Sequence, residues 1–165
     1  MFNAYGVVHE GQRFRLLSHG FVHADWTHLI FNMITLYFFG RNVESYFALL
    51  FGNGGVLMYV VFYLTALCAS SIPDLIRHRN NSWYNALGAS GAVSAVLFAA
   101  IFFRPEMSIM FMFVPFHIPG YIYAVLYLAY SAFMAYRGDS QIGHTAHFAG
   151  ALYGLVFPLL FVWLL

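Results

Sequence analysis

The chain has 165 residues, of which 62% are hydrophobic and only 8% are charged, with a formal net charge of +1. Soluble domains carry about 25% charged residues, so this chain has too little polar surface for a globule in water. We therefore expect a lipid bilayer as its main solvent. The near-neutral charge gives no sign of a nucleic-acid partner, and the single cysteine excludes an internal disulfide.

The first 25 residues contain no apolar run long enough to span a bilayer and no basic start typical of a signal peptide, so we expect a loop. Apolar runs then predict five helices, over residues 26–47, 54–72, 86–103, 120–136 and 143–165. Pro73 is expected to stop the second helix, and Pro158 to kink the last one. Residues 107–119 carry two prolines and are expected to form a buried extended or re-entrant stretch. The prediction is a single all-α polytopic membrane domain over residues 1–165.

The tetrapeptide Gly88-Ala89-Ser90-Gly91 precedes the apolar run of the third predicted helix. Glycine permits a tight turn, and the free backbone N–H groups at a helix start are donors that can stabilise an oxyanion. Ser90 is therefore a candidate nucleophile. The alternative is a serine N-cap with glycines for packing.

His147 opens the last predicted helix and shares one face with Gly150 and Gly154, at i, i+3 and i+7. Small residues four apart let helix backbones approach closely in a membrane, and Gly91 offers a small face beside Ser90. Helices pressed together there would bring His147 near Ser90 as a base for the hydroxyl. The alternative is a packing histidine near the membrane interface.

A third polar cluster lies at the start of the first predicted helix. His28 and Asn32, at i and i+4, share a face and can donate hydrogen bonds to an oxyanion. His19 and His23 precede them, and a metal site is the competing interpretation. Asp25 is the nearest acid and no cysteine joins the cluster, so we expect no metal and assign His19 and His23 to loop support.

Arg41 and Glu44 lie three residues apart near the end of the same helix. They are spaced for an ion pair at a membrane boundary, and simple solvation of both side chains is the alternative.

Taken together and in this order, these blocks resemble the rhomboid intramembrane serine proteases. The matching residues are Arg15, His23-x4-His28-x3-Asn32, Gly40-x3-Glu44, Gly88-Ala89-Ser90-Gly91 and Ala146-His147-x2-Gly150-x3-Gly154. The resemblance covers nearly the whole chain. It implies a rhomboid-like helical bundle in which five helices of a six-helix core are present and the first is missing.

The resemblance also implies roles for these residues. Ser90 would be the nucleophile and His147 the general base, without an acid and without a cofactor. His28, Asn32 and the Ser90 backbone N–H would form the oxyanion hole, in a water-filled cavity below the membrane surface. Structural support would come from seven residues: Arg15, His23, Glu44, Gly88, Gly91, Gly150 and Gly154.

Two segments would control access: residues 137–144 as a mobile cap and the 120–136 helix beside a lateral entry. The implied substrates are transmembrane helices of other proteins with small residues near the cleaved bond. The implied location is a bacterial plasma membrane, with several passes. An inactive rhomboid-like binder of transmembrane clients is the alternative, and a transporter ranks last because internal repeats are lacking.

Two further departures from the family pattern stand out. Some members place a tyrosine, which stacks on the histidine, at the position of Ser94, and serine cannot stack. The usual Trp-Arg pair of the first loop is Phe14-Arg15 here.

Overall fold

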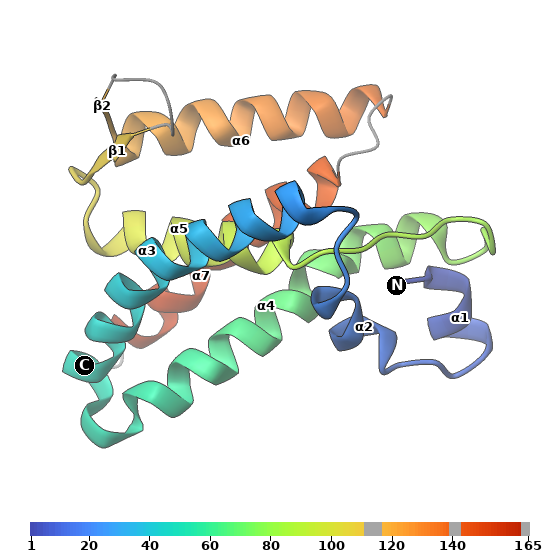
Figure 1. The fold of residues 1–165 in the computed structure, drawn as a ribbon, viewed down its shortest axis with the longest axis horizontal. Coiled ribbons are helices and arrows are strands. Elements are labelled where there is room, and N and C mark those ends of the chain that lie inside the picture. The colour runs from blue at the N-terminus through green and yellow to red at the C-terminus, as the bar shows by residue number, and fades with distance from the viewer. Residues whose placement is uncertain (111–116, 139–142, 163–165) are drawn as a thin grey trace.

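The computed structural model describes residues 1–110, 117–138 and 143–162, and most of them are helical. Figure 1 shows α3, α4, α5 and α7 crossing one another in a bundle, with α6 along one side and α1 and α2 at one end. The elements in chain order are α1 (Ala4–His9), α2 (Arg15–Ser18), the 3₁₀ turn η1 (His19–Phe21), α3 (Trp26–Phe51), the 3₁₀ turn η2 (Gly52–Gly54), α4 (Gly55–His78), α5 (Ser90–Phe103), β1 (Ser108–Met110), β2 (His117–Pro119), α6 (Gly120–Arg137) and α7 (His144–Val162).

The centre of the bundle is α5, which is packed against α3, α4, α6 and α7. All of its residues from 91 to 101 are buried, as expected of a helix that is apolar on every side. With 14 residues it is only about 21 Å long. That is shorter than the hydrocarbon core of a bilayer, which is about 30 Å thick.

Aromatic side chains fill the core where α3, α4 and α7 meet. Phe47 of α3 and Phe62 of α4 are fully buried, and their rings pack edge to face at 5.7 Å. Phe157 of α7 lies 4.9 Å from the Phe62 ring. Such rings bury large apolar areas and prefer these tilted contacts, so they hold the three helices together away from the candidate site.

Three predicted helix bounds are wrong. The helix expected to end at residue 47 continues as α3 to Phe51. The helix expected to stop at Pro73 continues as α4 to His78. Proline removes one backbone hydrogen bond, but Leu75 beyond it packs against the buried cluster of Phe2, Ala4 and Val7, and Asp74 accepts a hydrogen bond from Tyr84. These tertiary contacts hold the last turns in helical form.

The helix expected from residue 86 begins at Ser90 instead. Ala86 pairs with Phe2 in an isolated antiparallel bridge, with N···O distances of 2.8 and 3.0 Å. Gly88 has a φ of +104°, a conformation that breaks a right-handed helix and favours glycine. The N-terminal residues therefore fix the path of the segment that precedes α5. That path cannot be read from the sequence of the segment alone.

Residues 108–110 and 117–119 form a two-stranded antiparallel hairpin, β1 and β2. The expectation of extended backbone agrees with these ends, but the expectation of burial does not, because Ser108, Met110 and His117 are exposed and only Ile109 is buried. The remainder of the predicted stretch, residues 111–116, lies outside the described residues.

By length and apolarity, the described residues contain two candidate membrane spans, Trp26–His78 and His144–Phe161. The first comprises α3, η2 and α4, and α5 is a shorter apolar helix. Large apolar side chains also face outward from the bundle, including Leu49, Leu57 and Val125, which are 81%, 69% and 67% exposed. An exposed apolar surface of this extent suits lipid rather than water.

The contact between α5 and α7 is made backbone to backbone. A Cβ added to Gly150 would lie 1.9 Å from the Gly91 carbonyl oxygen, and one added to Gly154 would lie 2.1 Å from the Ala95 carbonyl oxygen. Neither backbone oxygen can move without moving α5. Glycine at both positions therefore sets the distance between the two helices.

We predict that Gly150→Ala destabilises the fold by about 3 kcal/mol, because the added methyl group forces α7 away from α5. Thermal unfolding in detergent micelles measures the effect. Gly54→Ala is the matched control, since its Cβ would meet only Phe51 Cβ at an ordinary 3.8 Å. Equal unfolding temperatures for the two variants would contradict the prediction.

Candidate active site

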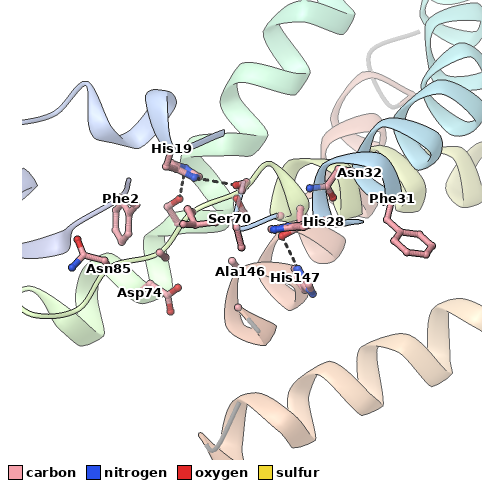
Figure 2. A pocket seen from close by; sticks show the side chains of 18 of the residues that line it. Phe2, His19, His28, Phe31, Asn32, Ser70, Asp74, Asn85, Ala146 and His147 are labelled. Carbon is pink, nitrogen blue, oxygen red and sulfur yellow. Dashed lines mark hydrogen bonds between the residues drawn. The ribbon is translucent and has the colours of Figure 1, made fainter. Parts of the chain in front are cut away.

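A cavity of about 890 Å³ opens where the first turns of α3, α5 and α7 meet the last turns of α4 (Figure 2). Its walls bring together polar residues that are distant in the sequence. They include His28 and Asn32 of α3, Ser90 of α5 and His147 of α7. The sequence prediction named these four residues, and here they line one space.

Ser90 is the first residue of α5, and its hydroxyl lies 2.7 Å from His147 Nε2 (Figure 2). The close packing of α7 on α5 produces this distance, because Gly150 follows His147 by about one turn on the same helix face. For Nε2 to accept the hydroxyl proton, the neutral imidazole carries its own proton on Nδ1. Among the described residues, no carboxylate hydrogen-bonds to that Nδ1 atom.

Gly88 lets the His28 ring approach the chain just before Ser90. A Cβ at Gly88 would lie 2.6 Å from His28 Cε1, so a side chain there would displace the imidazole as well as strain the backbone. His28 also has a fixed place in the first turn of α3, because Asp25 caps that helix by accepting the His28 backbone N–H at 2.7 Å.

Asn32 follows one turn later and is only 6% exposed, yet its Nδ2 atom has no hydrogen-bond partner among the described residues. A buried donor without a partner costs about 1–3 kcal/mol. A donor left in this state on the wall of a cavity is suited to an acceptor that arrives with a ligand.

Sequence analysis assigned His19 to loop support, and the structure gives it a specific place. His19 is buried, its Nδ1 atom lies 3.2 Å from the Gly88 carbonyl oxygen, and its Nε2 atom lies 3.1 Å from the Ser71 hydroxyl. Because a carbonyl only accepts, Nδ1 donates to Gly88. Burial lowers the pKa of His19 and so favours the neutral ring.

The remaining predicted support residues differ in their surroundings. Arg15 donates from Nε to the Gln12 side chain and from a terminal nitrogen to the Met1 carbonyl at 2.8 Å, within the N-terminal loop. His23 packs edge to face on His28 with ring centroids 5.1 Å apart. Burial and then the charge of His28 lower the pKa of His23.

Glu44 does not join this site. It is exposed on α3, 16 residues after His28, which corresponds to about 24 Å along the helix. The suggested ion pair with Arg41 is not formed, and Arg41 instead donates to the Tyr37 hydroxyl at 3.0 Å. Gly91 touches α4, since a Cβ added there would lie 2.5 Å from the Ser70 hydroxyl.

Ser94 is the position at which the sequence resemblance implies a stacking tyrosine in some members, and it has a different partner here. Its hydroxyl lies 2.8 Å from the Tyr127 hydroxyl of α6. An aromatic neighbour of His147 comes from its own helix, because the His144 ring packs edge to face on it at 6.0 Å. The predicted cap, residues 137–144, includes residues 139–142, which lie outside the described residues.

Sequence reasoning missed the α4 wall of the cavity, formed by Ser70, Ser71 and Asp74. A signal existed, because Ser70 and Asp74 are four residues apart in an apolar run and so share one helix face. The expected stop at Pro73 concealed it by placing Asp74 outside the helix.

The structure is an α-helical bundle with apolar helices suited to a membrane. A serine and a histidine are in hydrogen-bonding contact inside its cavity. Residues 10–164 match the rhomboid domain. The chain belongs to the rhomboid family.

Curated relatives agree with this assignment. The chain is 33% identical over 157 residues to RHOMBOID-like protein 12, mitochondrial, and 29% identical over 160 residues to Rhomboid-like protein 11, chloroplastic, both of Arabidopsis thaliana. The matches cover 86% and 92% of this chain but 44% and 52% of those proteins. The chain therefore spans about half the length of these relatives.

We predict that acid weakens the fold through His19. Its folded-state pKa lies below the unfolded value of about 6.5, so protons bind the unfolded chain more readily and stability falls as the pH drops below about 6.5. The slope approaches about 1.4 kcal/mol per pH unit for one group. Unfolding temperatures between pH 7 and 5 measure it.

His19→Gln removes the titrating ring, so its unfolding temperature should fall less over the same range. His9→Gln is the control, because His9 is exposed in the same N-terminal region. A pH slope for His19→Gln as steep as that of the unaltered chain would contradict the assignment.

Proposed function

We propose that this chain is an intramembrane serine endopeptidase that cleaves transmembrane helices of other membrane proteins. The observation that carries the proposal is the 2.7 Å contact between Ser90 Oγ and His147 Nε2 on the wall of a cavity. A serine hydroxyl is weakly nucleophilic alone and needs such a base. Family membership supports a membrane protein in which this pair acts as a catalytic dyad.

The proposed reaction has two halves. His147 Nε2 takes the Ser90 proton while Oγ attacks a peptide carbonyl, and the tetrahedral intermediate collapses as His147 returns the proton to the leaving amine. Water then hydrolyses the acyl-enzyme with the same base. The unpartnered Asn32 amide, the His28 ring and the Ser90 backbone N–H would donate to the oxyanion.

We place all five long helices in the bilayer. α5 is shorter than the hydrocarbon core, so one of its ends must lie below a membrane surface. Ser90 is half-buried and starts that helix beside the cavity, which would give the nucleophile access to water below the membrane surface. The bacterial plasma membrane stays a prediction of the sequence interpretation, since the relatives named above come from a plant.

We predict that Ser90→Ala and His147→Ala each abolish cleavage of a transmembrane reporter in liposomes. Ser45→Ala is the matched control, because Ser45 is exposed on α3 and bonds only to the Arg41 carbonyl. Its cleavage rate should equal that of the unaltered chain. A folded chain that binds the reporter without cutting it would instead support the inactive, client-binding alternative.

We also predict that Asn32→Ala lowers kcat by roughly 10²- to 10³-fold, as removal of one oxyanion donor does elsewhere. KM should change little, because the donor acts on charge that develops in the transition state. Steady-state kinetics on the same reporter separate the two constants. A raised KM with an unchanged kcat would assign Asn32 to substrate binding rather than to the oxyanion.

A further inference from the structure

The cavity that holds Ser90 and His147 also contains a buried acid, Asp74 of α4. Asp74 is only 4% exposed. The Tyr84 hydroxyl donates to its Oδ2 atom at 2.9 Å. Within the described part of the chain, no ion pair reaches Asp74, and its Oδ1 atom receives no hydrogen bond.

A buried carboxylate in this state is costly. Removing an ionised group from water without a cationic partner costs several kcal/mol, and one hydroxyl donor offsets only part of that. Two basic side chains follow on α4 but do not pair with it: Arg77 is exposed, and the His78 ring stacks on Tyr84 at 3.6 Å. Burial and then the Asp74 charge raise the pKa of Tyr84, so its hydroxyl remains a donor.

Asp74 lies close enough to the dyad to meet a bound substrate. The Ser70 side chain touches Gly91, the residue after Ser90, because a Cβ there would lie 2.5 Å from the Ser70 hydroxyl. Asp74 follows Ser70 by four residues, which is about 6 Å along α4. Figure 2 shows Ala146 between Asp74 and His147 in the pocket, with Ser70 above them in this view.

We infer that Asp74 is a specificity-determining residue that selects substrates with an arginine or lysine within two residues of the cleaved bond. The cationic side chain enters the cavity and pairs with Asp74 Oδ1, while Ser90 attacks the neighbouring carbonyl. A long flexible stem carries the charge past Ser70. This inference rests on the proposed function and adds a charge preference to the small residues that the family resemblance implies.

The test uses transmembrane reporters with alanine at the two residues on each side of the cleaved bond. At each of these four positions in turn, the alanine is replaced by arginine, methionine or glutamate. Methionine is a long uncharged comparison for arginine. We expect the arginine reporter at one position to exceed its methionine counterpart at least tenfold in kcat/KM, and the glutamate reporter to be the poorest. In Asp74→Asn the arginine-to-methionine ratio should fall at least tenfold, with the all-alanine reporter changed less than threefold.

Tyr84→Phe is the matched control, because it removes the hydroxyl bonded to Asp74 and keeps the carboxylate, so the arginine preference should persist. A second measurement needs no cleavage and no Asp74 variant. It compares how tightly peptides with the reporter sequences bind to the Ser90→Ala chain. There, the arginine peptide should bind at least tenfold more tightly than the methionine peptide.

Failure of the Asp74 proposal can be distinguished from failure of the proposed function. If the unaltered chain cuts the all-alanine reporter but shows the same arginine-to-methionine ratio as Asp74→Asn at all four positions, the role of Asp74 is overturned and the proposed function stands. If the unaltered chain cuts no reporter, the proposed function fails. The binding comparison with the Ser90→Ala chain then decides the role of Asp74 alone, and equal affinities for the arginine and methionine peptides overturn it.

Discussion

The direct contact between the backbones of α5 and α7 is the constraint on which the candidate site depends. Gly150 and Gly154 present no side chain to the Gly91 and Ala95 carbonyl oxygens, so the backbones of α7 and α5 pack directly against each other. His147 projects from the turn before Gly150 and therefore reaches the first residue of α5. A hydrogen bond of 2.7 Å tolerates little change in this spacing, which ties the chemistry to helix packing rather than to a flexible loop.

A second constraint fixes where α5 begins. The Phe2–Ala86 bridge, the His19 bond to the Gly88 carbonyl and the positive φ of Gly88 all act on the short segment before Ser90. The Gly88 N–H also donates to the His19 carbonyl at 3.1 Å. The N-terminal loop thus acts as part of the candidate site, because it helps to determine where α5 begins and so where Ser90 lies.

Much of the site could be predicted from the sequence, because small-residue spacing and helix faces are local properties. His147, Gly150 and Gly154 share a face by periodicity alone, and so do His28 and Asn32. The start of α5 and the continuation of α4 past Pro73 could not be predicted this way. Both depend on contacts with Phe2 and Tyr84, which are distant in the sequence. Ser71 was overlooked for the same reason, since its role depends on His19, 52 residues away.

Asp74 and His147 line the same cavity, and among the described residues no carboxylate hydrogen-bonds to His147. This raises the question of whether Asp74 is a third member of the proposed dyad. Its hydrogen bond argues against that role, because Oδ2 is engaged by Tyr84, and among the described residues Asp74 makes no hydrogen bond to His147. His147 is oriented instead by its helix and by the neighbouring His144 ring. In our proposal this carboxylate, which borders the cavity without bonding to His147, acts on the substrate instead. The proposal therefore gives the two parts of the cavity different roles: the Ser90–His147 pair of α5 and α7 would act in catalysis, and Asp74 of α4 would select the substrate.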